Sequence, residues 1–440
     1  MTKYIHFKKF LFLAIFFIVH CLIAYNAYFL AKDTAMGDGS ECKMLVKPAY
    51  KFKRVPQSDL AKECNAVNRI SADFAQVYFP ARVASSEAYN SKTPDPWHRP
   101  SRYAPFLHDI YRHTLCKLQY GYASLLNIGI QVLVFYLSFI IAFRKLHIRN
   151  YLFPAILIAN VCLFLTPSGL SWLERGQFSL FVASAYIWLF LGIIMRNPFY
   201  LVLSAILAYL KWTSLPLFFI VLALWILRAK DLKESFENFR FALIVPATFA
   251  LIYALDLQTS NLFLKGLIAQ ETTVSPQGLS LLFLVPRPLV KALPVFLVAI
   301  GCSRLIKNRN IFVAMMPYLA AVGILSLLYP SMAFDYSTPC LLCFIPLMAY
   351  WAEIIKRDHN WQGESPTGTP VWLDKIRRVL PFLALSFFCA FLLVASSFSY
   401  IIRQFGLHPL SAIFLYVGCA AVLLIFSTHL PCKVFTCQKD

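Results

Sequence analysis

The sequence predicts an all-α polytopic membrane protein with about 12 transmembrane helices. Of its 440 residues, 59% are hydrophobic and only 14% are charged, and the mean hydropathy is +0.63. A water-soluble domain of average composition has about 25% charged residues. The hydrophobic residues also fall in successive runs, many of them near the roughly 20 residues that cross a bilayer as a helix. These observations exclude soluble, disordered, coiled-coil and collagen-like proteins.

The apolar runs divide the chain into a first helix, a long polar segment and a helical bundle. The first run is Phe10–Ala31; lysines precede it and no small-residue cleavage pattern follows it. We therefore expect a retained helix, with a long signal peptide as the alternative. Residues 32–119 form the long segment, residues 120–427 the bundle and residues 428–440 a tail, all within one integral-membrane domain over residues 1–440. The later spans are predicted at residues 120–143, 151–167, 177–195, 198–211, 213–228, 241–256, 286–303, 311–329, 336–353, 379–402 and 409–427.

The lysines and arginines predict the orientation of these spans. The chain has 41 Lys and Arg against 21 Asp and Glu, a formal net charge of +20. Alternation from a cytoplasmic N-terminus concentrates the cations in inner loops and tails, as the positive-inside rule requires, and leaves both termini in the cytoplasm. The cations form short clusters between apolar runs and no basic stripe interleaved with aromatic residues. Nucleic-acid binding is therefore not predicted.

An interruption divides the apolar stretch over residues 198–228. Lys211-Trp212-Thr213-Ser214 stands in its middle. One continuous helix of that length would overrun the bilayer by about 15 Å, so we predict a hairpin of two half-length helices whose turn lies in the outer half of the membrane. A lysine in that position is costly unless it meets an anion or a water-filled cavity.

The long first loop ends in a predicted amphipathic helix that would lie at the membrane interface. Its apolar side carries Leu107, Ile110, Tyr111, Thr114, Leu115 and Leu118. Its polar side carries His108, Asp109, Arg112, His113 and Lys117. We expect an outward-facing pocket between this loop and the ends of the spans.

Ionisable and polar residues gather at the outer ends of spans and in outer loops. Span centres hold no comparable set, whereas an ion-coupled carrier would be expected to place carboxylates near the midplane. Asp73 has two interpretations, a helix N-cap and a catalytic acid or base. Glu174 and Arg175 could simply pair at the interface. The set comprises Asp73, Arg99, Arg102, Glu174, Arg175, Gln177, Lys211, Lys265, Arg287, Lys291 and Asp335.

The twelve cysteines do not indicate a redox compartment. Cys340 and Cys343 form a CxxC, but they lie inside a predicted span without a second pair or a histidine cluster nearby. Packing is therefore favoured over a zinc or redox site. Cys42 and Cys64 could pair if the first loop faces an oxidising compartment.

Six short segments, in their order along residues 70–350, resemble the GT-C glycosyltransferases of glycosyltransferase family 87. Each motif alone is only a few residues long, so the resemblance depends on their shared order. Where the family commonly has a histidine, this chain has Phe334-Asp335-Tyr336, which leaves the sugar open. The segments are Asp73-Phe74, Arg102-Tyr103-Ala104-Pro105, Glu174-Arg175-Gly176-Gln177-Phe178-Ser179, Lys211 through Pro216, Ser275 through Ser280, and Tyr329-Pro330-Ser331 through Tyr336.

The resemblance implies a GT-C-like fold and an inverting hexosyltransferase in a bacterial plasma (inner) membrane, with its active site on the non-cytoplasmic side. The donor would be a polyprenyl-phosphate-linked sugar, with mannose as one candidate, and the acceptor a glycolipid or lipid-linked molecule. Neither a cofactor nor a metal is implied, and a monomer is compatible with this activity. The alternative is a multi-pass transporter or lipid flippase without glycosyl transfer.

The resemblance also implies roles for individual residues. Asp73 would be the general base for the acceptor hydroxyl. Lys211, Arg175 and Arg287 would hold the donor phosphate, with Arg99 and Arg102 as second choices. Contacts to the sugar or the acceptor would come from Gln177, Tyr103, Arg102, Glu174, Asp335 and Tyr336.

Overall fold

The protein is helical, apart from one short parallel strand pair. A computed structural model describes residues 14–22, 25, 71, 73–83, 85–89, 100–212, 215–229, 231–273, 277–302, 315–330, 332–333, 335–361, 371–404 and 410–428. The predicted residues Arg99, Cys42 and Cys64 lie outside this described part, as does most of the first predicted helix. The strand pair is β1 (Gln277–Gly278) and β2 (Met332–Ala333), which joins two of the segments that carry the family resemblance.

The helices follow one another along the chain with short connections. In the outer loop they are α3 (Ala75–Tyr78), η1 (Pro80–Arg82), η2 (Ser85–Tyr89), α4 (Pro105–His113) and η3 (Leu115–Lys117). The bundle then contains α5 (Tyr120–Lys145), η4 (Arg149–Tyr151), α6 (Leu152–Phe164), α7 (Pro167–Arg175), α8 (Ser179–Ile194), α9 (Pro198–Tyr209), α10 (Leu215–Leu227), α11 (Leu232–Ala242), α12 (Ile244–Leu255), α13 (Leu257–Thr273), η6 (Leu281–Phe283), α14 (Arg287–Cys302), α15 (Met316–Leu328), η9 (Asp335–Cys343), α16 (Phe344–Trp361), α17 (Val371–Gln404) and α18 (Leu410–Thr428).

Several of these helices have the length and composition of membrane spans. Within the described ranges, three are long and apolar enough to cross a bilayer, namely Tyr120–Lys145, Leu232–Leu255 and Ser337–Lys356, and a bent pair over Arg149–Phe164 and Pro167–Leu173 makes a fourth if counted as one span. Six further helices are apolar but shorter. The structure is therefore that of a helical membrane protein, while the count of about 12 spans stays a prediction.

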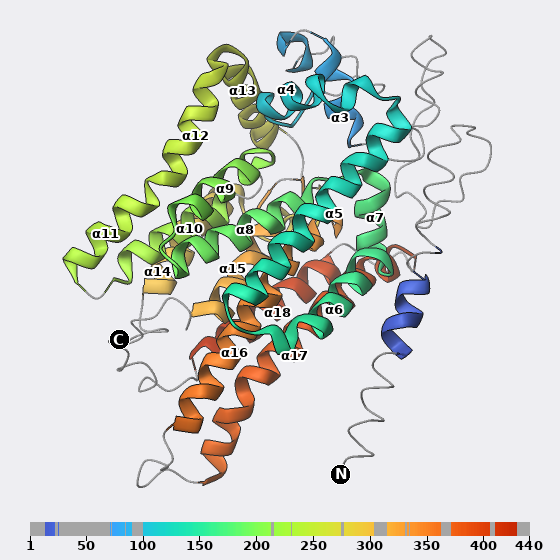
Figure 1. The fold of residues 1–440 in the computed structure, drawn as a ribbon. Coiled ribbons are helices and arrows are strands. Elements are labelled where there is room, and N and C mark those ends of the chain that lie inside the picture. The colour runs from blue at the N-terminus through green and yellow to red at the C-terminus, as the bar shows by residue number, and fades with distance from the viewer. Residues whose placement is uncertain are drawn as a thin grey trace.

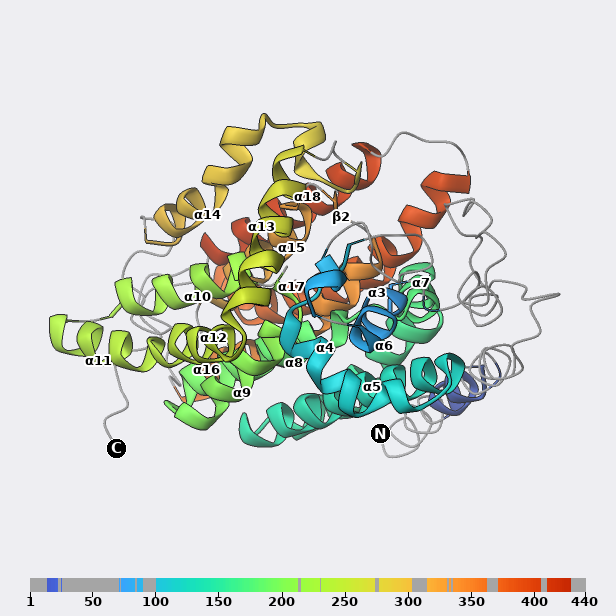
Figure 2. The same cartoon turned by 90° about the horizontal axis from the view of Figure 1, so that it is seen from above.

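The helix α8 forms the centre of the bundle. Its residues Ser179–Ile193 are all buried, which accords with a sequence that is apolar on every side. It packs against α5, α9 and η9, and these elements surround it in two perpendicular views (Figure 1, Figure 2). The outer-loop helices α3 and α4 lie with α13 at one end of the bundle, called the outer end below (Figure 1).

The interruption predicted near Lys211 is present as a break between α9 and α10. The two half-length helices pack on different neighbours, because α9 contacts α8 and α12 whereas α10 contacts α14 and α15. The break therefore redirects the chain between two parts of the bundle. Lys211 lies at this change of direction.

The amphipathic helix was predicted to turn its apolar side to the membrane interface, and this is wrong for most of that side. Leu107, Tyr111 and Leu115 are buried in the core of the protein. On the predicted polar side, Arg112 donates from Nε to the Ala81 oxygen (2.8 Å) and from Nη2 to the Val83 oxygen (2.8 Å). These bonds dock α4 onto η1, because they satisfy carbonyl groups that the short helix leaves open.

A buried polar stripe on α5 was missed by the sequence analysis, which placed no comparable set at span centres. Ser124, Asn127 and Gln131 are fully buried and recur at helical spacing. Tyr111 donates to Asn127 Oδ1 at 2.6 Å, so the stripe begins beneath the outer loop. Apolar composition over the whole run concealed it, because three polar residues scarcely lower the average hydropathy of a 26-residue helix.

A glycine permits the sharp bend between α6 and α7. The axes of the pair differ by 69°, and α7 begins with a Thr166 N-cap whose side chain accepts from the Gly169 amide at 3.3 Å. A Cβ atom added at Gly169 would lie 2.1 Å from the Cys162 oxygen and 2.4 Å from the Leu163 oxygen. The bend places the C-terminal end of α7 beside the outer loop, where Asp73 lies.

We expect Gly169→Ala to destabilise the fold by about 3 kcal/mol, because the methyl group would force two backbone carbonyls apart. Thermal unfolding of the purified protein in detergent measures the change. Gly129→Ala on α5 is the matched control, since a Cβ atom there meets nothing within 4 Å. The control should keep or slightly raise the unfolding temperature. Equal unfolding temperatures for the two variants would contradict the role given to Gly169.

Candidate functional site

The outer-loop segment that contains Asp73 is pinned to the bundle through Ser71. Ser71 is fully buried with a left-handed φ of 63°, and its oxygen accepts from the Tyr120 hydroxyl (2.7 Å) and the Ala75 amide (3.1 Å). Its own hydroxyl bonds to the Ser124 hydroxyl on α5. A non-glycine residue with positive φ costs free energy, so these bonds are needed to hold it. The first residue of the predicted site thus rests on the polar stripe of α5.

The end of α7 approaches this segment closely because residue 176 is a glycine. Gly176 is the C-cap of α7 with φ 62°, a left-handed conformation that glycine adopts without a steric penalty. A Cβ atom there would lie 2.9 Å from Ser71 Oγ and 3.0 Å from Phe74 Cβ. The approach lets the Asp73 amide donate to the Arg175 oxygen at 3.0 Å. The Glu-Arg-Gly-Gln segment is therefore joined to the Asp73 segment by backbone contacts as well as by side chains.

The side chain of Trp172 fixes the backbone of Gln177. Trp172 is fully buried, and its indole Nε1 donates to the Gln177 oxygen at 2.7 Å. The Gln177 amide donates in return to the Trp172 oxygen at 3.2 Å. These two bonds, with the glycine turn between them, orient the Gln177 side chain toward the outer end of the bundle.

Lys211 is held by the residue that follows it. The Lys211 amide closes the end of α9 by donating to the Ala208 oxygen at 3.1 Å. The ring of Trp212 then packs 5.5 Å from the ring of Tyr209 and 5.1 Å from that of Phe263, in an aromatic cluster with α12 and α13. Because Trp212 anchors the break on that side, the lysine side chain is free to extend toward α8.

These elements bring four predicted residues into one network, called the Asp73–Lys211 network below. Gln177 Nε2 donates to Asp73 Oδ2, and Lys211 Nζ donates to Gln177 Oε1 at 2.6 Å. Arg175 Nη1 lies 3.5 Å from Asp73 Oδ2 as an ion pair. A single amide group therefore links the carboxylate to the ammonium. The network combines two cations with one carboxylate, a formal charge of +1 that suits an additional anion.

The N-cap interpretation of Asp73 is not supported. The N-cap of α3 is Phe74, and no side-chain bond caps this helix. The Asp73 carboxylate instead faces Gln177 and Arg175, and only 7% of the residue is exposed. Such a buried carboxylate with two polar partners from a distant part of the chain is more typical of a functional site than of a helix cap.

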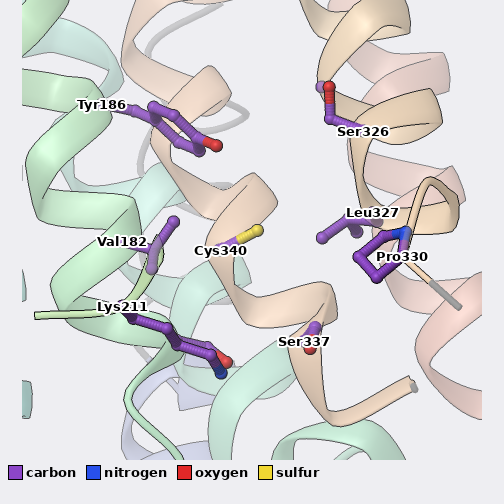
Figure 3. A pocket seen from close by; sticks show the side chains of 10 residues that line it. Val182, Tyr186, Lys211, Ser326, Leu327, Pro330, Ser337 and Cys340 are labelled. Carbon is purple, nitrogen blue, oxygen red and sulfur yellow. The ribbon is translucent and has the colours of Figure 1, made fainter. Parts of the chain in front are cut away.

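A pocket of about 480 Å³, which includes its part open to solvent, lies beside Lys211 (Figure 3). Lys211 lines it from the break between α9 and α10, and Val182 and Tyr186 line it from α8. Ser326 and Leu327 stand on the opposite wall (Figure 3). The complete described lining is Ser179, Val182, Tyr186, Lys211, Gly323, Ser326, Leu327, Pro330, Ser337 and Cys340.

The other predicted site residues have varied positions. Tyr103 is buried with its ring centroid 4.7 Å from that of Phe178, so it packs against the residue next to Gln177. Arg102 is exposed, and Arg287 is a half-buried residue that begins α14. The side chains of Glu174, Asp335 and Tyr336 lie outside the described part of the structure, although their backbone belongs to α7 and η9.

Several pocket residues were missed by the sequence analysis. Ser179, Val182 and Tyr186 recur at intervals of three and four, a helical face that the uniformly apolar composition of α8 concealed. Ser326 and Ser337 carry no motif that would distinguish them from packing serines. Cys340 and Cys343 are free and buried, which supports packing over a redox site, and within the described residues no group of three or more His, Cys, Asp and Glu side chains could hold a metal ion.

His108 is a correction to the predicted polar side of α4. Only 2% of it is exposed, and its ring nitrogens lie 2.9 Å from Ser101 Oγ and 3.3 Å from the Tyr89 hydroxyl. Burial, with a smaller effect from nearby Arg112, lowers the pKa of His108 to about 3. The imidazole is therefore neutral and structural in the outer loop near pH 7.

Comparison with known proteins found no matching family model, no matching curated protein and no matching solved structure.

We expect the outer loop to lose stability as the pH falls. The folded protein keeps His108 neutral, so this contribution is complete above the ordinary pKa of 6.5 and is lost as the pH falls toward about 3. The loss should approach about 1.4 kcal/mol per pH unit below that ordinary value. Hydrogen exchange of residues 100–118 at pH 7 and pH 5, corrected for intrinsic rates, measures it. His108→Phe should abolish the pH dependence, whereas His113→Phe, at an exposed position, should preserve it.

Proposed function

We propose that this protein is an integral-membrane glycosyltransferase that transfers a hexose from a polyprenyl-phosphate donor to a lipid-linked or glycolipid acceptor. The observation that carries the proposal is the Asp73–Lys211 network, in which a buried carboxylate and a lysine are joined through one amide beside a pocket. A base and a phosphate-binding cation in one place are what this transfer requires. The network also lies between apolar helices, where a lipid-linked substrate would approach from the bilayer.

The chemistry would use Asp73 as the base. The acceptor oxygen would form a bond to the anomeric carbon while the bond from that carbon to the phosphate oxygen breaks. The electron pair of the broken bond would leave with polyprenyl phosphate, and the proton of the acceptor hydroxyl would pass to the Asp73 carboxylate. Because phosphate is a good leaving group, one carboxylate suffices, in contrast to glycoside hydrolysis, where a second carboxyl group protonates the leaving oxygen.

Lys211 and Arg175 would stabilise the phosphate. In the transition state negative charge grows on the leaving oxygen, and a fixed cation in a poorly hydrated site stabilises that charge far more than it would in water. This role would also account for a lysine among apolar helices, a costly placement in the absence of an anion. Arg287 stays a prediction as a third phosphate contact.

The proposal places the site on the non-cytoplasmic face of a bacterial plasma membrane, with both termini in the cytoplasm. A transporter or flippase is the rival function. In the described helices the buried polar stripe on α5 consists of serine and amide side chains, whereas an ion-coupled carrier typically uses carboxylates at that depth. A flippase would move the lipid donor without forming a glycosidic bond, so product formation separates the two functions.

Purified protein in lipid nanodiscs should form a labelled glycolipid from radiolabelled polyprenyl-phosphate hexose and an extract of membrane lipids. Asp73→Asn should lower the turnover about 10²–10⁴-fold, because general-base catalysis contributes that much. Asp109→Asn is the matched control, since that carboxylate pairs with Arg112 at 3.7 Å on α4 and lies outside the network. Transfer by Asp73→Asn at the wild-type rate would remove Asp73 from the reaction. A flux of donor lipid across vesicles without any glycosyl product would favour the flippase.

The phosphate role of Lys211 makes a separate prediction. Lys211→Met should raise the KM for the donor about 10-fold to 100-fold, because a hydrogen bond to a charged group contributes about 1.5–3 kcal/mol. The variant should also weaken inhibition by polyprenyl phosphate, a product that lacks the sugar. Lys265→Met, at an exposed lysine of α13, should change neither value. Unchanged product inhibition in Lys211→Met would contradict the assignment, provided that size-exclusion chromatography shows a folded protein.

A further inference from the structure

The pocket beside Lys211 has a polar deep end that the proposed chemistry at Asp73 does not use. Tyr186 and Ser326 are buried, whereas Lys211, Pro330 and Ser337 are half-buried and form its mouth. Figure 3 shows Lys211 and Ser337 toward one end and Tyr186 and Ser326 toward the other. The pocket volume of about 480 Å³ lies in the range of about 300–1,000 Å³ that holds small ligands.

The pocket extends inward from the outer end of the bundle. Ser179 begins α8, and Tyr186 follows seven residues later, which is two helical turns or about 10 Å deeper. On the opposite wall Pro330 follows α15 and Gly323 lies two turns back along it. The two walls therefore run in parallel for the same depth, and a ligand held by Lys211 at the mouth would reach inward between them.

The side chains at the deep end distinguish between two possible occupants. The hydroxyl of Ser326 is buried and has no hydrogen-bond partner among the described residues. A bound isoprenoid chain would leave it unpaired, which costs about 1–3 kcal/mol for a buried polar group. A polyol would pair with it, because hydroxyl groups both donate and accept, as do the serine and tyrosine hydroxyls that line this pocket.

We propose that the pocket holds the ring of the transferred hexose, with Ser326 bonded to a ring hydroxyl remote from the anomeric carbon. The inference rests on the proposed function and adds to it the position of the sugar and a residue that selects it. Lys211 at the mouth would hold the phosphate, the anomeric carbon would lie between Lys211 and Asp73, and the rest of the ring would extend toward Tyr186 and Ser326. Ser326 is then a specificity-determining residue that contacts the substrate.

Labelling of Cys340 tests the occupant without any need for turnover. Cys340 lines the pocket, and its sulfur points into it (Figure 3). Wild-type protein in nanodiscs is treated with a small methanethiosulfonate reagent, and peptide mass spectrometry follows the rate at Cys340. Saturating polyprenyl-phosphate mannose, glucose or galactose should slow the labelling several-fold for at least one sugar, and polyprenyl phosphate alone should slow it less. Equal protection by the sugar-free lipid would assign the pocket to the isoprenoid chain and overturn the inference.

Kinetics of Ser326→Ala test the sugar contact itself. The variant should fold, because removal of an unpaired buried hydroxyl is nearly neutral for stability. Its KM for the best donor should rise about 5-fold to 10-fold, the loss of one hydrogen bond, while inhibition by polyprenyl phosphate stays unchanged. A structural disturbance would move both values. Ser184→Ala is the matched control, since that buried serine of α8 bonds to the Leu180 oxygen at 2.9 Å and does not line the pocket.

The outcomes separate this inference from the proposed function. Transfer by the wild type with an unchanged donor KM in Ser326→Ala would overturn the inference and leave the proposed function intact. Protection of Cys340 by a sugar-bearing lipid without any glycosyl product would overturn the proposed function and support a sugar-binding pocket. Neither protection nor product would overturn both.

Discussion

The amide group of Gln177 is the interaction on which the candidate site depends. Its nitrogen faces Asp73 and its oxygen accepts from Lys211, so one planar group determines the separation of an acid and a cation from distant parts of the chain. An amide can do this because it has both a donor and an acceptor, whereas a glutamate at this position could only accept from Lys211 and would repel Asp73. The carboxylate and the ammonium are thereby kept close without neutralising each other directly.

The surrounding structure serves to hold that amide in position. The bend at Gly169 brings α7 to the outer end, the left-handed turn at Gly176 reverses the chain, and the indole of Trp172 bonds the Gln177 backbone. The next residues enter α8, which is buried on all sides and cannot shift without disturbing its neighbours. A glutamine placed at the start of such a helix loses little conformational freedom when a ligand binds, which favours binding.

The sequence predicted the membrane-protein class, the break at Lys211 and the members of the network, and the reasons are physical. A lysine within an apolar run is costly enough to indicate a function by itself. The order of Asp73, Arg175 and Gln177 along the chain did not show how they meet, because Gly169 and Gly176 act through backbone geometry that no side-chain pattern reveals. The burial of His108 was missed for a related reason, since helical periodicity assigned it to a polar side that tertiary packing covers.

The distribution of polar groups in the bundle indicates which way a substrate would enter. Ser71 and Ser124 join the outer loop to the top of the α5 stripe, and their hydroxyls satisfy each other. Ser326, across α8, lacks such a partner. A buried polar group that is left unpaired reduces stability, so its persistence is best explained by a bound state in which the partner is supplied. The protein thus spends hydrogen bonds on closing one side of α8 and keeps the other side open, toward the pocket where Lys211 already favours an anion.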